Sequence, residues 1–507
     1  MNINRPVHII TNKFYTLDDF RMLIETQPKI ALAPEVLEAI DAGARFVKKK
    51  SLEDIYIYGV NTGYGSLCET RVDSTKLDEL QYKHVISHAC GIGEPAEEDI
   101  VRLMIIIKLL TFRTGVTGIS SQPVLRLIDF WNEGVIPVVP RKGTVGASGD
   151  LAPLAHLALP IIGLGQVHYQ NKIYDAVEVL HKFDWQPVKL KPKEGLALTN
   201  GVQYINAMAI QSILRIEEYV RSADVLAAMS IQGFSASKTF YQALYHQTSY
   251  HQDRSDVAEN LRNLLTDSNH FDLPTCNHSK QDPYSFRCIP QVHGAIRQTF
   301  NHAKDVMEKE CNGVSDNPLF FPEQDEILFG GSLHGESTAF ILDFLAIALS
   351  ELAYLSERRS YQMLSGQRGL PSFLINNPGL DSGMMVVQYS SAALVNENKV
   401  LCTPASIDTI PTCQLQEDSV SMGGTSGYKL WQIAENCESI FAIELLIGCQ
   451  AIDMNKGLQL SSRTRSVHEE FRKEVAFLDV DRIMSVDINS ATKFFGKMRR
   501  VWRDELK

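Results

Sequence analysis

The periodicity of apolar positions predicts a chain built mainly from α-helices. After Pro34, which suits a first helical turn, apolar residues recur at helical spacing as far as Val47, and Lys48 to Lys50 favour a helix end there. From residue 202 onward the runs are longer, and several are apolar on more than one face. Such helices need partners on several sides, which predicts a bundle shared between subunits. The long runs span 202–231, 292–312, 337–364 and 429–453.

Two kinds of stretch interrupt this helical pattern. Residues 238–290 are polar, rich in His, Tyr and Asn, and only weakly periodic, which is typical of a functional or mobile segment. We interpret them as an active-site lid. Pro137 and Pro140 indicate extended chain, and 81–95 indicates a helix that ends near Gly91.

The loop Gly143-Thr-Val-Gly-Ala-Ser-Gly-Asp-Leu-Ala-Pro-Leu154 carries the most unusual chemistry. The unhindered backbone nitrogen of Gly149 can fold back onto the carbonyl carbon of Ala147. Loss of one water closes a five-membered ring, and loss of a second, from Ser148, leaves an exocyclic methylidene. The product is an electrophile that no ordinary side chain supplies. Asp150 is placed as the N-cap of the helix that follows.

Composition narrows the class of protein. The 507 residues carry a formal net charge of -11, which argues against a nucleic-acid surface, and 44% hydrophobic residues can fill a large core. The nine cysteines are scattered without zinc-finger spacing, so we expect no metal site and reduced thiols in a cytoplasmic protein. The N-terminus lacks the apolar core of a secretion signal. The apolar run 103–107 is stopped by Lys108 and is too short to cross a membrane.

Several segments resemble, in the same order, motifs of the aromatic amino acid ammonia-lyases and aminomutases. The resemblance covers the chain from Tyr58 to about Asp453. Besides the loop above, the matching segments are Ile57-Tyr-Gly-Val-Asn-Thr-Gly-Tyr-Gly-Ser-Leu67 (with Tyr64 in place of Phe), Gly195-Leu-Ala-Leu-Thr-Asn-Gly201, Gln281-Asp-Pro-Tyr-Ser-Phe-Arg-Cys-Ile-Pro-Gln291, Ser315-Asp-Asn-Pro318, Gly330-Gly-Ser-Leu-His-Gly335, Glu397-Asn-Lys399 and Leu415-Gln-Glu-Asp-Ser-Val-Ser-Met-Gly423.

The family implies a mainly α-helical fold of the long-helix, fumarase/aspartase-like type. The resemblance implies a smaller N-terminal part, 1–200, that carries the cofactor loop, and a long-helix bundle domain, 201–507, that carries the lid segment 238–290. In this family the tripeptide Ala147-Ser148-Gly149 cyclises autocatalytically to 4-methylideneimidazol-5-one, and no external cofactor is needed. The family also implies a small amino acid as substrate and a homotetramer whose active sites combine residues from three chains, with no nucleic-acid or membrane partner.

The resemblance also assigns roles to individual residues. Tyr58 is the expected base for the substrate β-proton, and a phenol needs a positive or polarising environment that lowers its pKa for this task. Asn200 is expected beside the cofactor, where it hydrogen-bonds the adduct. Arg287 fits the substrate carboxylate as a two-pronged clamp. Tyr284 is the expected second active-site phenol, and Gln281 a polar contact.

The end of the site that binds the substrate ring favours histidine. Ser87 and His88 stand where family members that act on histidine mostly carry Ser-His, although some tyrosine lyases share that pair. Glu417 keeps the carboxylate of histidine lyases where tyrosine and phenylalanine lyases carry Gln. Two departures bear on substrate fit: Leu333 replaces a Phe, and Ser419 replaces a His. The expected reaction converts L-histidine to urocanate and ammonia, as in histidine catabolism.

Two other functions remain open. Within the family, the chain is alternatively a tyrosine ammonia-lyase or a 2,3-aminomutase, which returns the amine to the β-carbon. Outside it, the chain is a non-catalytic helical paralogue. The intact loop at 147–149, with Tyr58 and Arg287, counts against the paralogue.

Overall fold

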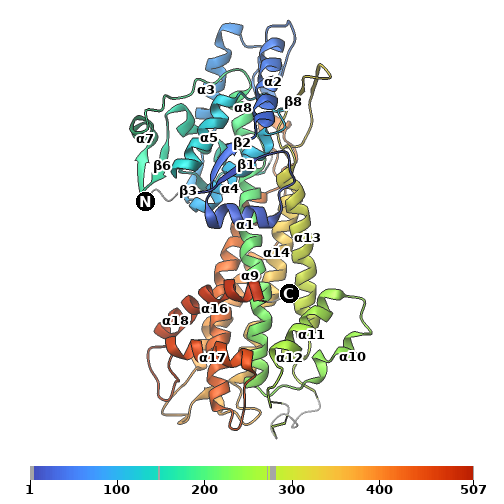
Figure 1. The fold of residues 1–507 in the computed structure, drawn as a ribbon, viewed down its shortest axis with the longest axis vertical. Coiled ribbons are helices and arrows are strands. Elements are labelled where there is room, and N and C mark those ends of the chain that lie inside the picture. Colours follow the sequence, from blue (N-terminus) through green and yellow to red (C-terminus); the bar gives the residue numbers. More distant parts are fainter. Residues whose placement is uncertain (1–4, 147–148, 271, 274–280, 506–507) are drawn as a thin grey trace. The chain divides into compact units, whose positions relative to one another are not determined.

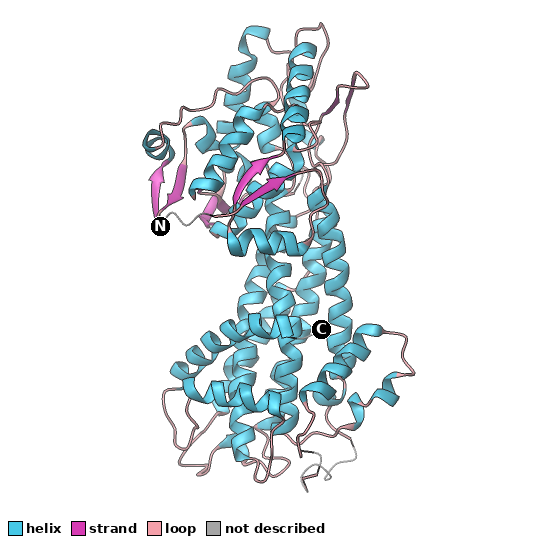
Figure 2. Cartoon of the chain, viewed as in Figure 1, coloured by secondary structure: helices cyan, strands magenta, loops and turns pink. Residues whose placement is uncertain are grey.

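Helices dominate the structure and its strands are short (Figure 2). The computed structural model describes residues 5–146, 149–270, 272–273 and 281–505. The chain forms two compact units, each assembled from three segments. Unit 1 consists of Met1–Gln211, Lys304–Asp343 and Pro404–Tyr428, and unit 2 of Ser212–Ala303, Phe344–Thr403 and Lys429–Lys507. The mainly α-helical fold is as predicted, whereas the two-domain division at residue 200 stays a prediction.

Unit 1 contains all the described strands and eight of the shorter helices (Figure 1). Its strands form four small sheets: β1 with β2 in parallel, and β3–β5, β4–β6–β7 and β8–β9 in antiparallel pairing. The elements are β1 (Val7–Ile10), α1 (Leu17–Thr26), β2 (Lys29–Leu32), α2 (Pro34–Lys50), α3 (Leu77–His88), β3 (Ile92–Pro95), α4 (Glu98–Phe112), α5 (Ser121–Glu133), β4 (Ile136–Pro137), β5 (Pro140–Lys142), α6 (Leu151–Ala158), β6 (Gln166–Tyr169), β7 (Lys172–Asp175), α7 (Ala176–Lys182), α8 (Glu194–Thr199), β8 (Leu319–Phe321) and β9 (Glu326–Leu328).

Four long helices run through the unit boundaries, and the remaining helices belong to unit 2. The long helices are α9 (Gln203–Gly233), α13 (Ile289–Asn312), α14 (Glu336–Met363) and α16 (Gly423–Met454), and the others are α10 (Ala243–His246), α11 (Gln252–Leu264), α12 (Tyr284–Arg287), α15 (Met385–Leu401), α17 (Ser462–Glu474) and α18 (Met484–Glu505).

Local sequence signals explain most helix ends. Thr16 and Asp19 form a reciprocal capping box at the start of α1, and α2 begins at Pro34 and ends on its three lysines. The four long helices confirm the predicted apolar runs to within a few residues. Helix α3 ends at His88, slightly before the expected Gly91. The segment 238–290 contains α10, α11 and α12, and its action as a lid stays a prediction.

Unit 2 buries charge as well as apolar surface. The ring of Tyr219 lies 5.5 Å from Phe441 and 6.1 Å from Phe495, which joins α9, α16 and α18. Glu444, on an apolar face of α16, accepts both prongs of the Arg359 guanidinium, and neither side chain is exposed beyond 1%. A buried carboxylate on an apolar helix face is tolerated when it is paired in this way.

Helix α14 is the one described helix that is long and apolar enough to cross a membrane. Within the molecule, however, 61% of its apolar window is buried by the rest of the chain. Helices at the core of water-soluble proteins pass the same test of length and composition, so this helix is weak evidence for a membrane span.

Candidate active site

The loop that follows β5 is held in place by two other motif segments of unit 1. The amide of Met422 donates to the carbonyl of Val145 at 2.9 Å. The carbonyl of Gly146 accepts from the amide of Gly335 and from the hydroxyl of Ser421, both at 3.2 Å. Three segments that lie far apart in sequence, around 145, 335 and 421, therefore meet at the predicted cofactor loop.

Gly149 and Gly201 approach each other too closely for any side chain. Gly149 has φ +75°, and a Cβ built on it would lie 2.0 Å from the carbonyl oxygen of Gly201. That same oxygen accepts from the amide of Asp150 at 2.7 Å. Both positions therefore require glycine. The other two residues of the tripeptide, Ala147 and Ser148, lie outside the described residues.

Asp150 caps a different helix from the one that the sequence predicts. It does stand just before Leu151, at the start of α6, but its side chain makes no capping bond there. Instead its carboxylate accepts from the amides of Tyr204 and Ile205, in the first turn of α9, and from the hydroxyl of Thr144, each at 2.9 Å. Complete burial raises the pKa of Asp150 to about 6, although these donors oppose the shift.

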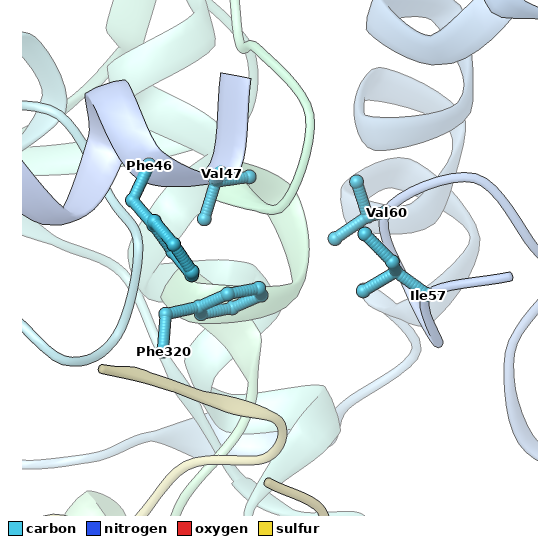
Figure 3. Close-up of a cluster of buried hydrophobic side chains, with 5 residues drawn as sticks. All are labelled: Phe46, Val47, Ile57, Val60 and Phe320. Atoms are coloured by element: carbon cyan, nitrogen blue, oxygen red, sulfur yellow. The ribbon is translucent and has the colours of Figure 1, made fainter. Parts of the chain in front are cut away.

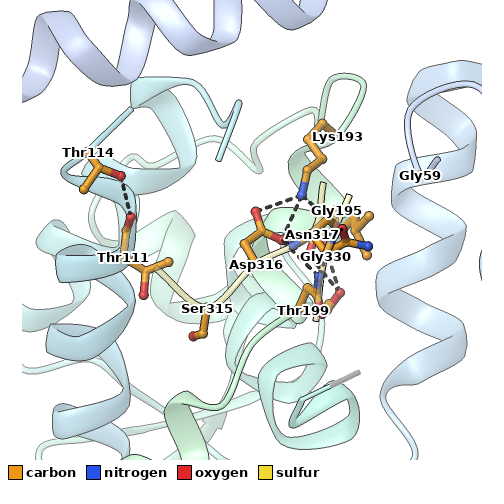
Figure 4. Close-up of polar contacts among 12 residues, drawn as sticks. Gly59, Thr111, Thr114, Lys193, Gly195, Thr199, Ser315, Asp316, Asn317 and Gly330 are labelled. Atoms are coloured by element: carbon orange, nitrogen blue, oxygen red, sulfur yellow. Dashed lines mark hydrogen bonds and ion pairs between the residues drawn. The ribbon is translucent and has the colours of Figure 1, made fainter. Parts of the chain in front are cut away.

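Asn200 is fixed from two sides next to the same loop. Its side-chain amide donates to the carboxylate of Asp316 at 3.0 Å and to the carbonyl of Asn317 at 3.1 Å. Its own carbonyl accepts from the ammonium of Lys108. A second ammonium, that of Lys193, binds both oxygens of Asp316 at 2.8 and 2.9 Å (Figure 4). Burial lowers the pKa of Lys108 to about 7, with the Asp316 carboxylate acting in the opposite direction.

Buried apolar residues on both sides of Tyr58 anchor its loop. Ile57 and Val60 belong to a small core cluster with Phe46 and Val47 of α2 and Phe320 of β8 (Figure 3). The rings of Phe46 and Phe320 lie edge to face at 6.5 Å. Because the neighbours on either side of Tyr58 are held in this cluster, the loop presents the phenol from a fixed backbone.

The surroundings of the Tyr58 phenol within unit 1 do not lower its pKa. Burial raises the pKa of Tyr58, and the nearby Glu417 carboxylate raises it further. The amide of Gly65, which donates to the phenol oxygen at 3.0 Å, acts in the opposite direction. The sequence-based expectation of a lowered pKa is therefore not met by these neighbours.

His88 is held as a hydrogen-bond acceptor at the end of α3. Its Nδ1 lies 2.7 Å from the carbonyl of His84, so this nitrogen carries the proton and Nε2 keeps its lone pair. The hydroxyl of Ser87 lies 3.0 Å from the same Nδ1. Burial lowers the pKa of His88, whereas the Glu417 carboxylate raises it. The ring of Tyr64 lies 6.4 Å from the rings of both His88 and Tyr58. His84 and Tyr64 continue the cluster, with ring centroids 3.9 Å apart.

Glu417 is partly buried and has one carboxylate oxygen already engaged. The hydroxyl of Thr412 donates to Oε2 at 2.7 Å, and the Thr412 amide donates to the Glu417 carbonyl at 2.8 Å. The carbonyl of Ser419, two residues further on, accepts from the ring of His334 at 3.2 Å. Leu333 is half-buried beside that histidine in sequence. Of the two positions that depart from the family pattern, Ser419 thus takes part in this hydrogen bond, and Leu333 directly precedes its other partner, His334.

The residues expected to bind the substrate carboxylate lie in unit 2. The Arg287 guanidinium stacks over the ring of Tyr284 at 4.4 Å, and the Tyr284 ring is 68% exposed. Their helical turn is anchored by Asp282, which accepts from Arg368 and from the amide of Ser237, both at 2.8 Å. Gln281 is exposed at the start of this turn. Within unit 1 the structure brings together Tyr58, His88, Glu417 and, at the loop, Gly149 and Asn200.

The sequence interpretation missed four buried groups around the loop. Lys108 interrupts a continuous apolar run on α4, and a charge that stays buried on such a helix has to be paired, which was a usable signal. His84 and the pair formed by Lys193 and Asp316 gave no comparable signal, because their partners lie more than 100 residues away in sequence.

Two features together match the class of the ammonia-lyases and related aminomutases. They are the long helices and the loop in which Gly149 packs against Gly201, held by two distant motif segments. The sequence model of the aromatic amino acid lyase family matches residues 15–473. Histidine ammonia-lyase of Photorhabdus laumondii is 40% identical over 484 residues, which cover 95% of this chain and 94% of that protein. Histidine ammonia-lyase of Aliivibrio fischeri is 41% identical over 478 residues, or 94% of each.

Solved structures agree with this class. Histidine ammonia-lyase from Trypanosoma cruzi aligns with a TM-score of 0.89 at 36% identity, covering 99% of this chain and 95% of that one. A tyrosine aminomutase from Streptomyces globisporus aligns with a TM-score of 0.92 at 32% identity, covering 99% of both. The chain therefore belongs to the aromatic amino acid lyase family and is a carbon–nitrogen lyase.

Proposed function

We propose that this protein deaminates L-histidine to urocanate and ammonia without oxidation. The observation that carries the proposal is the presence of two fixed acceptors among the residues expected at the ring-binding end: Nε2 of His88, whose Nδ1 is bound to the His84 carbonyl, and the Glu417 carboxylate, which Thr412 holds. An imidazole ring presents N–H donors, which suit both groups. Several bacterial relatives that are 38–41% identical to this chain are histidine ammonia-lyases.

The loop fits the cofactor that the family implies. Gly149 meets Gly201 where no Cβ fits, and donors from around 335 and 421 hold the segment before it. The 4-methylideneimidazol-5-one group formed from Ala147, Ser148 and Gly149 supplies an electrophile for the substrate amine. Tyr58 takes the β-proton, and its fixed loop keeps the phenol at one place relative to the site.

The remaining roles follow from chemistry and position. Arg287 binds the substrate carboxylate through two parallel N–H bonds, and Tyr284, stacked against it, offers a second phenol. Gln281 adds a polar contact. Fixing the carboxylate also fixes the β-carbon near its base, which is a positioning effect.

We further propose a cytoplasmic homotetramer whose active sites are shared between chains. The support is an apolar stripe on α14, where Phe344, Ile347, Tyr354 and Tyr361 are each 44–50% exposed at spacings of three and seven residues. That spacing is typical of helix–helix seams. The eight cysteines that the structure describes are free, which suits a reducing compartment. The raised pKa of Tyr58 also favours a site completed by another chain.

A tyrosine ammonia-lyase or a tyrosine 2,3-aminomutase is the second candidate. The structural similarity to a tyrosine aminomutase favours it, as do Leu333 and Ser419, which loosen the match to the histidine type. His88 also suits a phenol, so it does not separate the two substrates.

A substrate panel tests the proposal. The purified enzyme is given L-histidine, L-tyrosine or L-phenylalanine, and the conjugated acids are followed by ultraviolet absorbance. Chromatography of the products for β-amino acids separates a lyase from an aminomutase. Intact-mass measurement reports whether two waters are lost, which distinguishes an enzyme from a non-catalytic paralogue. Faster formation of coumarate from tyrosine than of urocanate from histidine would overturn the substrate assignment.

A further inference from the structure

Asp316, in the motif Ser315-Asp-Asn-Pro318, is the centre of a buried polar network (Figure 4). It is 2% exposed, and its Oδ1 accepts from Lys193 at 2.9 Å and from the Asn200 amide at 3.0 Å. Its Oδ2 accepts from Lys193 at 2.8 Å, and Lys193 is fully buried. Neither charge contacts the predicted catalytic phenol or the ring-binding end. Lys193 binds Asp316, and Asp316 in turn binds Asn200.

The network decides which way the Asn200 amide points. An amide nitrogen has two hydrogens, and both are used, on the Asp316 carboxylate and on the Asn317 carbonyl at 3.1 Å. Turning the amide over would set its oxygen against two other oxygens. The side-chain oxygen, Oδ1, must therefore face away from Asp316, and no donor among the described residues reaches it.

The backbone of Asn200 is held as firmly as its side chain. Lys108 donates to its carbonyl oxygen, and the following residue, Gly201, pairs with Gly149 of the cofactor loop. A Cβ on Gly201 would lie 2.3 Å from the Ser315 carbonyl, so the segment carrying Asp316 packs directly against this backbone. The free oxygen of Asn200 is thus a fixed acceptor beside the loop.

We propose that Asp316 is a positioning residue for deamination, which with Lys193 holds the Asn200 amide so that Oδ1 accepts an N–H bond from the substrate amine. The inference rests on the proposed function. An amine that approaches the cofactor loop brings N–H donors, for which an amide oxygen is the matching partner. The paired Lys193 keeps the Asp316 charge satisfied within the protein.

Ligand binding without turnover tests this role. In a Ser148→Ala background, which lacks the cofactor, calorimetry compares L-histidine with 3-(imidazol-4-yl)propanoate, and L-tyrosine with 3-(4-hydroxyphenyl)propanoate. Each pair differs only by the amine. In Asp316→Asn the new amide can donate to Asn200, which lets the Asn200 amide turn over. We expect the amino acid to lose about tenfold or more in affinity, the size of one bond to a charged group, while the amine-free analogue is unchanged.

Two further variants serve as controls for this experiment. Asp316→Asn leaves Lys193 buried without its charge partner, so Lys193→Met/Asp316→Asn, with neither charge, serves if the single variant does not fold. Asp78→Asn is the matched control, because Asp78 forms an exposed ion pair with Lys191 at 2.6 Å and should leave both affinities within about twofold.

The outcomes separate this inference from the proposed function. Equal losses for the amino acid and its analogue, or no loss for either, would overturn the role of Asp316 even in an enzyme that makes urocanate. A selective loss of L-tyrosine binding, in a protein that does not deaminate histidine, would support Asp316 and overturn the histidine assignment. If neither amino acid binds the folded Ser148→Ala protein more tightly than its analogue, the amine contact is absent and the inference fails.

Discussion

Replacing Glu417 by Gln tests ring recognition with little change of shape. Oε2 accepts from the Thr412 hydroxyl at 2.7 Å, and the proposed contact with the substrate ring is made by the same carboxylate. In Glu417→Gln the Thr412 hydroxyl can turn and accept from the new Nε2, so Oε1 keeps its place as an acceptor. The backbone bond between the two residues is unaffected. The variant therefore removes the charge and keeps the contact.

The size of the effect follows from that difference. A hydrogen bond to a charged group contributes about 1.5–3 kcal/mol, and a neutral one about 1 kcal/mol, so the charge accounts for about 0.5–2 kcal/mol. For histidine we expect kcat/KM to fall by about 2- to 30-fold. A tyrosine phenol donates nearly as well to an amide oxygen, so any tyrosine turnover should change by less than about threefold. Glu417→Leu also removes the acceptor and should cost histidine about tenfold more.

The assay measures kcat/KM for both amino acids by the absorbance of urocanate and coumarate. Asp418→Asn is the control, because it removes the same charge from the adjacent, exposed side chain. Equal losses for histidine and tyrosine in Glu417→Gln would refute the reasoning. So would an Asp418→Asn variant as impaired as Glu417→Gln, since the effect would then be one of general charge and not of contact.

Three further predictions concern the cofactor, the base and the buried carboxylate. Ser148→Ala should give a folded, inactive protein whose intact mass shows no loss of two waters; turnover near the wild-type rate would exclude the cofactor assignment. Tyr58→Phe should lower kcat by orders of magnitude with far less change in KM, and an unchanged kcat would rule out the base. Asp150 has its pKa raised from 3.8 to about 6 in the fold, so the folded state binds this proton more tightly and loses stability as pH rises through that window. Asp150→Asn keeps the acceptor and should abolish this loss, about 3 kcal/mol in total; the difference in urea unfolding free energy between variant and wild type should change with pH only across that window, and a constant difference would contradict the burial argument.

The fold was largely predictable because its helices are long and their apolar positions are periodic. Apolar runs alone locate α9, α13, α14 and α16 to within a few residues, and Pro34 and the Thr16 capping box fix two helix starts. The assembly of the two units was not predictable in this way. Each unit draws on three separate segments, and their association depends on contacts that no local pattern records.

The residues of the candidate site likewise fall into two groups, those that a local motif predicts and those that depend on long-range contacts. The motif segments pointed to Tyr58, His88 and Glu417. In the structure the rings of Tyr58 and His88 each lie 6.4 Å from Tyr64, and the Tyr58 loop contacts the segment of Glu417 through the Ser66 amide and Cys413 Sγ. The groups that orient the site could not be predicted from the sequence, because each binds a partner that is far away along the chain. Asp150 caps α9 from 54 residues away, and Lys193 meets Asp316 across 123 residues. A helix start such as Asp150-Leu-Ala-Pro looks like a local cap, yet the carboxylate goes to the helix whose amides lie nearer in space.

The placement of buried charge gives a physical reason to regard this chain as a working enzyme. Lys108, Lys193, Asp150 and Asp316 are all buried within unit 1, close in the chain or in space to Asn200 and to Gly201, which pairs with Gly149. Taking charges out of water costs several kcal/mol each, and apolar residues of similar volume are often at least as stable. A paralogue that kept only the fold would have no use for such a cluster. Lys108 and Asp316, however, bind Asn200 directly, Lys193 pairs with Asp316, and the Asp150 carboxylate holds the first turn of α9, which follows Asn200 in the chain. Burying these charges costs stability, and its effect is to fix the geometry at one place, beside the loop where the chemistry of the family occurs.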